Sequence, residues 1–204
     1  MSHFLNDDQK AIRDVAAKFA VNELMPIANE IDASESTPDW VVKRCAELGF
    51  YGITIAEEFG GIGAGLVTAC VVLEEIAKAS PAFAGLLSVQ MILCPATVDV
   101  LGTPEQKARL LPKSASGERL MAYSQTEPAG VGNIAYHQTK LTPDGNGYRL
   151  DGHKLFCTQG AAKTYLVMPR TKRDGRDGHG CVLAEADAAR PAVQQPEEQP
   201  GWRR

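Results

Sequence analysis

The chain has 204 residues, of which 44% are hydrophobic and 23% are charged, and its formal net charge is −4. This composition is that of an ordinary globular protein with enough apolar side chains for a core, and it argues against a largely disordered chain. The acidic balance argues against a nucleic-acid-binding surface, because such surfaces need clustered Lys and Arg. The densest positive cluster mixes with Asp and Gly and indicates a solvated loop: Arg170, Lys172, Arg173 and Arg176.

The cysteines and histidines show no pattern of a disulfide framework or a metal site. Five cysteines are far apart without a Cys-x-x-Cys pair, and the four histidines lack metal-ligand spacing. Residues 1–10 are polar, so no signal peptide is expected, and the longest strongly apolar run, residues 66–73, is too short to span a bilayer. We therefore expect a cytoplasmic protein with reduced thiols, no bound metal and no membrane partner.

The first hundred or so residues predict helices. Asn6 and Gln9 form a capping-box pattern, and Ile12 and Phe19 then fall on one helical face. Pro26 is expected to bend or divide this first helix.

A second helix is predicted to start at residues 37–39, with Thr37 as the cap and Pro38 at the first helical position. It should bury Trp40 and Val41, and Gly49 suits a left-handed stop.

Residues 51–66 are rich in glycine and predict a loop that turns sharply or approaches another segment closely. The spacing resembles a GxGxxG phosphate loop only superficially, because no βαβ context surrounds it.

Three further helices are expected. The first covers residues 66–79 and should bury Val67 and Ile76. Residues 82–101 are apolar nearly all round and predict a central buried helix. The last begins at residues 103–106, where Thr103 and Gln106 form a second capping box, and it stops near Pro112.

After residue 117 the pattern changes to strands. Residues 121–126, 165–168 and 180–183 predict strands, and residues 144–147 predict a turn. Asp151 and Gly152 lie between two apolar runs and predict a two-residue hairpin. The fold class is therefore α+β: an all-α helical domain over residues 1–116 is followed, over residues 117–204, by an incomplete antiparallel β-barrel-like domain.

The last twenty residues do not predict a central strand, since Pro191, Pro196 and Pro200 interrupt them. Trp202 lies close to the end of the chain. We expect the β-domain to be incomplete as it stands.

Two segments carry a family resemblance. Residues 121–128 read Met-Ala-Tyr-Ser-Gln-Thr-Glu-Pro, and residues 154–160 read Lys-Leu-Phe-Cys-Thr-Gln-Gly. In order and spacing they resemble the two flavin-contacting segments of the acyl-CoA dehydrogenase family. Residues 57–61, 103–117 and 197–203 resemble other parts of that family, so the resemblance covers nearly all of this chain and about the first half of a family member.

The resemblance implies FAD as the cofactor and names its contacts. Backbone groups of Tyr123, Gln125 and Thr126 would hydrogen-bond the flavin edge, and polarising that edge favours hydride arrival. Phe156 would pack against the flavin ring, with Cys157 beside it and Thr158 donating near N5. Each aromatic has an alternative interpretation as a core residue of a β-domain.

The chain departs from the family pattern at Gly132, which stands where the family has a Ser that contacts the CoA part of the substrate, and at Asn133, which replaces an Asp. Gly132 is therefore assigned to cofactor and substrate binding through its backbone alone. The family's proton-abstracting glutamate lies in a C-terminal helical domain beyond this sequence, so no catalytic residue is assigned here.

The resemblance implies a flavin-dependent acyl-CoA dehydrogenase, expected as a truncated copy, that acts on an acyl-CoA and passes electrons to an electron-transfer flavoprotein. It also implies a homo-oligomer or a complementing subunit. One alternative is a non-catalytic or degenerate partner subunit that needs another chain to complete the flavin site. Another is a relative that uses oxygen as the oxidant.

Overall fold

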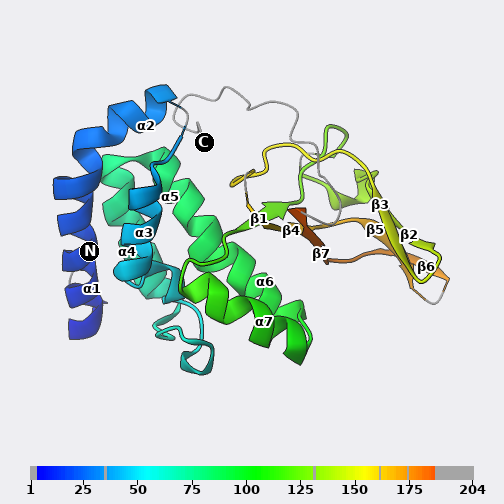
Figure 1. Ribbon diagram of the computed structural model, residues 1–204, viewed down its shortest axis with the longest axis horizontal. Coiled ribbons are helices and arrows are strands. Elements are labelled where there is room, and N and C mark those ends of the chain that lie inside the picture. Colours follow the sequence, from blue (N-terminus) through cyan, green and yellow to red (C-terminus); the bar gives the residue numbers. More distant parts are fainter. Residues whose placement is uncertain (1–3, 35, 131, 161, 174, 187–204) are drawn as a thin grey trace. The chain divides into compact units, whose positions relative to one another are not determined.

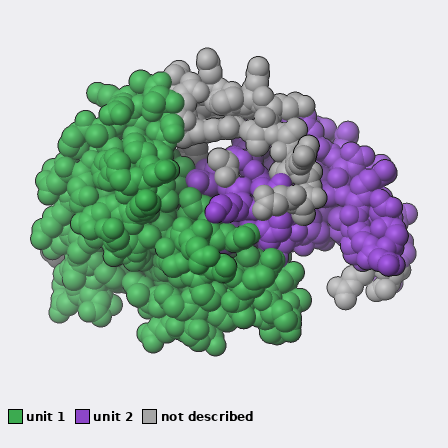
Figure 2. All heavy atoms as spheres, viewed as in Figure 1, with its two compact units in different colours: residues 1–120, 193–204 green, residues 121–192 purple. Residues whose placement is uncertain are grey.

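The computed structural model describes residues 4–34, 36–130, 132–160, 162–173 and 175–186. Within this part the chain forms two compact units, one ending at residue 120 and the other starting at residue 121 (Figures 1 and 2). The predicted tail, from residue 187 onward, lies outside the described residues. The assignment of residues 1–116 and 117–204 to two domains therefore stays a prediction.

In the described part of the first unit, all regular secondary structure is helical. Both predicted capping boxes are present, at Asn6 with Gln9 and at Thr103 with Gln106. The predicted cap at Thr37 is wrong, because the third helix begins at Asp39 without a side-chain cap. The helices and helical turns are α1 (Asp7–Phe19), η2 (Ala20–Leu24), η3 (Met25–Ile27), α2 (Ala28–Ser34), α3 (Asp39–Glu47), η4 (Phe50–Gly52), η5 (Glu57–Phe59), α4 (Gly65–Ala79), α5 (Pro81–Ser88), η6 (Val89–Leu93), α6 (Cys94–Leu101) and α7 (Pro104–Ala115).

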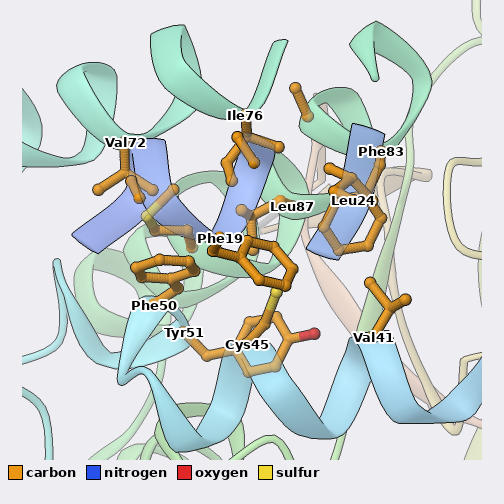
Figure 3. Close-up of a cluster of buried hydrophobic side chains, with 14 of the residues drawn as sticks. Phe19, Leu24, Val41, Cys45, Phe50, Tyr51, Val72, Ile76, Phe83 and Leu87 are labelled. Carbon is orange, nitrogen blue, oxygen red and sulfur yellow. The ribbon is translucent and has the colours of Figure 1, made fainter. Parts of the chain in front are cut away.

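The core of this unit forms where α1, α3, α4 and α5 face one another (Figure 3). Phe19 and Phe50 meet edge to face with their ring centroids 6.0 Å apart, a favoured aromatic geometry. Val41 and Ile76 are buried as predicted, whereas Trp40 and Val67 are exposed. Periodicity identified the helices correctly but misplaced the edge of the buried face at these two residues.

Two of the prolines inside helical runs follow a π-helical turn, whereas Pro112 lies inside α7, which runs on to Ala115. Pro26 comes two residues after η2, and Pro95 comes two residues after η6. A proline lacks an N–H and its ring crowds the carbonyl four residues earlier, so a locally widened turn relieves the clash. The helical run therefore continues through Pro26, where the turns η2 and η3 divide α1 from α2, as the expected bend or division at this proline predicts.

The continuous helical run Pro81–Leu101 is the central helix predicted from the sequence. By length and composition alone it could cross a membrane, which corrects the expectation that residues 66–73 are the longest apolar run. Phe83, Leu87 and Met91 lie in the helical core, and burial in a core accounts for such a composition.

The glycine-rich loop is shaped by close packing within the helical unit. A Cβ atom on Gly61 would lie 2.0 Å from the Ile55 carbonyl oxygen, so only glycine fits there. Gly60 has a φ of 80°, in the left-handed region that suits glycine. The loop is therefore a tight structural turn without the βαβ surroundings of a phosphate loop.

The second unit carries two sheets in the described residues (Figure 1). One has the order β1-β4-β7 and the other β3-β2-β5-β6. The strands are β1 (Met121–Ser124), β2 (Lys140–Asp144), β3 (Gly147–Asp151), β4 (Thr164–Val167), β5 (Arg170–Arg173), β6 (Arg176–His179) and β7 (Val182–Glu185).

The pairing in these sheets is mixed. β1 pairs with β4 in parallel, β2 meets β5 in parallel, and the remaining pairs are antiparallel. A helical domain followed by a β-domain is thus confirmed, and within the described part the strands do not close into a barrel.

Two local predictions in the β unit are wrong. The hairpin turn lies between β2 and β3, and residues 152–157 are irregular rather than a strand. Gly152 packs so tightly against Thr139 that an added Cβ would lie 2.3 Å from the Thr139 Oγ1 atom. The basic cluster from Arg170 onward forms the β5–β6 hairpin instead of an irregular loop.

Candidate functional site

The two segments that resemble flavin-contacting segments lie side by side at the end of β1. Three consecutive carbonyls after Tyr123 are bonded to other parts of the β unit. Ser124 O accepts from Met168 N at 3.1 Å, and Thr126 O accepts from Leu155 N at 2.9 Å. Gln125 O accepts from Lys154 Nζ at 2.8 Å. The first segment is thereby fixed along its length to the second segment and to the end of β4.

A buried ion pair stands behind these carbonyls. Lys154 Nζ lies 2.7 Å from Glu127 Oε1, and the two side chains are only 10% and 3% exposed. The Glu127 carboxylate also accepts hydrogen bonds from the backbone N–H groups of Gln138 and Thr139. A buried carboxylate with several donors is satisfied in its ionised form.

Hydrogen bonding decides the protonation state of Glu127. Burial raises the pKa of this carboxyl, but the hydrogen bonds from Gln138, Lys154 and Thr139 outweigh burial and hold the pKa at about 2. An acid with so low a pKa is a poor proton acceptor near neutral pH. The contacts and the low pKa therefore give Glu127 the role of a structural anion.

The second segment has an unusual backbone at the residue expected to face the cofactor. Phe156 has a φ of 52° and Gln159 a φ of 68°, values that non-glycine residues seldom adopt. The Phe156 side chain is 48% exposed although it is a large apolar group. Such strain in an exposed aromatic is more typical of a binding site than of a core residue.

Cys157 joins the two segments from the other side. Its Sγ lies 2.9 Å from the Ser124 Oγ, and the thiol is half-buried. The sequence placed Cys157 beside the flavin-contacting residues, and the structure brings it next to the end of β1.

The N–H groups of Thr126 and Glu127 point away from the second segment because of the geometry of their peptides. In a trans peptide the N–H points opposite to the C=O, and the described chain holds no cis peptide. Because the carbonyls of Gln125 and Thr126 are bonded inward, the N–H groups of Thr126 and Glu127 point away from those partners. Neither N–H group has an acceptor within the described residues, and the same holds for the Thr158 hydroxyl.

The remaining predicted site residues lie on β1 and on the loop before η7. Tyr123 lies on β1, paired in register with Leu166 of β4. Gly132 is exposed, and a Cβ added there would meet no atom within 4 Å. Asn133 caps the short turn η7 (Ile134–Tyr136) by accepting from Ala135 N at 3.0 Å, a role that an Asp would also perform.

Lys154 is the residue whose role the sequence reasoning missed. It is the first residue of the second segment, and the motif assigns it no contact of its own. A lysine two residues before an aromatic gave no sign that its ammonium would be buried. Among the described residues no cluster of His, Cys, Asp or Glu could hold a metal ion.

Comparison with known proteins identifies the family. Residues 6–118 match the family model described as acyl-CoA dehydrogenase, N-terminal domain. The chain is 35% identical over 200 residues to the mitochondrial isobutyryl-CoA dehydrogenase of Dictyostelium discoideum, covering 97% of this chain and 48% of that enzyme. This protein belongs to the acyl-CoA dehydrogenase family.

Solved structures agree with this assignment. An acyl-CoA dehydrogenase from Bacillus anthracis, solved in complex with FAD, matches with a TM-score of 0.87 at 28% identity over 98% of this chain and 34% of that one. A structure reported for the electron transferring flavoprotein of Acidaminococcus fermentans matches with a TM-score of 0.81 at 31% identity over 91% of this chain and 49% of that one. The chain spans about half the length of the curated relatives that it matches.

The residues at the end of β1 fit a flavin ring in their chemistry. The ring presents oxygen and nitrogen acceptors along one edge and a flat apolar face. The Thr126 N–H and the Thr158 hydroxyl, which have no acceptor among the described residues, are donors for such an edge, and the exposed ring of Phe156 can cover such a face. The donor set contains no unpaired negative charge, since Glu127 is neutralised by Lys154.

Proposed function

We propose that this chain supplies the flavin-ring site of an FAD-dependent acyl-CoA dehydrogenase. The single observation that carries the proposal is the pairing of the two segments. The carbonyls of Gln125 and Thr126 accept hydrogen bonds from Lys154 Nζ and Leu155 N. The N–H groups of Thr126 and Glu127 therefore point outward, near the strained and exposed Phe156. A preformed set of donors of this kind stabilises charge without reorganisation.

Each residue has a specific task in this proposal. Thr126 donates its backbone N–H, and Thr158 donates its hydroxyl, to acceptors along the flavin edge. Phe156 packs against the ring, with Tyr123, Gln125 and Cys157 completing the surroundings. Bound FAD supplies a hydride acceptor for the Cα–Cβ oxidation of an acyl thioester. We assign no proton-abstracting base to this chain.

The substrate and partners follow from the family. We propose an acyl-CoA as the substrate, with Gly132 next to its CoA portion. We propose an electron-transfer flavoprotein as the electron acceptor. We also propose that the chain assembles as a homo-oligomer or with a complementing subunit. The cytoplasmic location stays a prediction, since the relative from Dictyostelium is described as mitochondrial.

A titration of the purified chain with FAD tests the proposal. We expect saturable quenching of flavin fluorescence and a structured visible band for the bound cofactor. Thr158→Val should weaken FAD binding severalfold, because about 1 kcal/mol is lost with one neutral hydrogen bond. The control is Thr142→Val, which removes an exposed hydroxyl that donates to the Arg149 carbonyl on the β2–β3 hairpin. A chain that stays colourless and leaves flavin fluorescence unchanged would contradict the proposal.

A second candidate function is a non-catalytic partner subunit. It is favoured by Gly132, which stands where the family has a Ser whose hydroxyl contacts the substrate. Size-exclusion chromatography with light scattering separates the candidates. A flavin-free monomer contradicts both, whereas a flavin-free complex with a second chain supports the partner subunit.

A further inference from the structure

We propose that Lys154 is a positioning residue: its buried ammonium holds the two flavin-facing segments at the spacing that the ring requires. The inference rests on the proposed FAD site, but the contacts that carry it belong to the protein alone. Neither the composition nor the motif distinguishes Lys154 from other lysines. Its role follows from the three contacts of its Nζ atom.

The ammonium group has three donors, and all three are used. Nζ lies 2.8 Å from Gln125 O, 2.7 Å from Glu127 Oε1 and 2.7 Å from Met168 O. These acceptors come from the first segment, from the buried carboxylate behind it and from the residue after β4. One charged group therefore joins three stretches of chain that are also linked by the hydrogen bonds from Leu155 N to Thr126 O and from Met168 N to Ser124 O, by the Ser124–Cys157 contact and by the β1–β4 pairing.

The position of Lys154 in the chain makes this role specific. It lies two residues before Phe156 and four before Thr158, so a shift of its Cα displaces both proposed ring contacts. Its acceptor Gln125 O belongs to the same peptide as the Thr126 N–H. The lysine thus fixes the direction of one proposed donor and the placement of the aromatic beside it.

The effect of Lys154 on stability and its effect on positioning can be measured separately, because a second substitution removes the unpaired charge without restoring the bridge. Lys154→Met removes the ammonium and leaves the Glu127 charge buried without its partner, which destabilises the β unit. The double variant Glu127→Gln/Lys154→Met removes that charge as well and recovers much of the stability. It still lacks the group that ties Gln125 O to Met168 O.

The test measures amide hydrogen exchange and FAD affinity in the full chain. In Lys154→Met we expect faster exchange at the Leu155 and Met168 amides and FAD binding weakened tenfold or more. In the double variant we expect thermal stability to recover while FAD binding stays at least tenfold weaker than in the parent chain. Lys172→Met is the matched control, since this exposed lysine lies 3.8 Å from Asp177 in the same unit.

Each result is decisive. Unchanged exchange at Leu155 and Met168, or full recovery of FAD affinity in the double variant, overturns the positioning role. If Lys154→Met does not fold, the double variant supplies both measurements. If the parent chain binds no FAD, the proposed function fails for this chain, whereas faster exchange at the two amides in the double variant still supports the bridge and unchanged exchange overturns it.

Discussion

The Thr54 hydroxyl donates a hydrogen bond to the carbonyl of Met91 in the central helical run. Pro95 lies four residues after Met91, where a non-proline residue would supply the N–H. A hydroxyl from the glycine-rich loop thus takes the place of the α-helical N–H that Pro95 cannot offer. We predict that Thr54→Val lowers the free energy of unfolding by about 1–2 kcal/mol, measured by urea denaturation.

Two further variants, at Thr97 and at Pro95, test whether the Thr54 hydroxyl compensates for the N–H that Pro95 lacks. Thr97 also donates its hydroxyl to a carbonyl, that of Leu93 at 2.8 Å, but on the exposed side of the same run. Thr97→Val should change the free energy of unfolding by less than about 0.5 kcal/mol. In a Pro95→Ala background the cost of Thr54→Val should shrink, because the alanine N–H can reach Met91 O. An equal cost in both backgrounds would refute the explanation.

The second prediction concerns acid stability and Glu127. Folding lowers the pKa of this carboxyl from 4.5 to about 2, so its ionised form stabilises the fold above pH 4.5. That contribution, of the order of 3 kcal/mol, should be lost progressively as the pH falls from about 4.5 to about 2. Urea denaturation at a series of pH values measures it.

The comparison with Glu127→Gln isolates this group from the other carboxylates. The stability difference between the parent chain and the variant should be constant above pH 5 and should narrow as the pH falls toward 2. A difference that does not vary over this range would contradict a low pKa for Glu127.

The third prediction uses the five cysteines, all of which are free thiols. Cys70 is exposed and should react first with a maleimide at neutral pH. Burial raises the pKa of Cys181 to about 11, and burial with the nearby Glu23 charge raises that of Cys45 to about 12, so both should react slowly. Saturating FAD should protect Cys157 and leave the Cys70 rate unchanged, as measured by mass spectrometry of labelled peptides. Equal Cys157 rates with and without bound FAD would argue against its place beside the ring.

The fourth prediction restores the missing hydroxyl at Gly132. A Cβ at this position meets nothing within 4 Å, so Gly132→Ser should change the free energy of unfolding by less than about 0.5 kcal/mol. Calorimetric titration with butyryl-CoA should show that the FAD-loaded variant binds it about fivefold more tightly than the parent chain does, because one neutral hydrogen bond contributes about 1 kcal/mol. Gly178→Ser on β6 is the control. Identical affinities for the two variants would remove Gly132 from the proposed substrate site.

Local signals in the sequence predicted the helical unit well. Asn6 with Gln9 and Thr103 with Gln106 satisfy helix ends through contacts three residues apart, so the sequence alone contains both partners. Trp40 was misplaced because periodicity identifies a helical face without saying how far the neighbouring helices extend over it.

Non-local pairing limited the prediction of the β unit. The Asp151-Gly152 pair has the composition of a hairpin turn, but Gly152 is used for close packing against Thr139. The parallel pairing of β1 with β4 joins residues more than forty positions apart, and the turn residues of the sequence do not predict such a pairing. The bridge made by Lys154 was missed for the same reason, since its three acceptors lie 14 to 29 residues away along the chain.

The backbone amides of the first segment provide the most direct measurement of the central claim. An NMR titration of the isotope-labelled chain with FAD should shift the Thr126 and Glu127 amide signals saturably, while the amides of the distant β5–β6 hairpin stay unchanged. Saturable binding that leaves both amides unshifted, or the absence of any saturable change in the spectrum, would contradict the claim that the end of β1 forms a flavin-ring site.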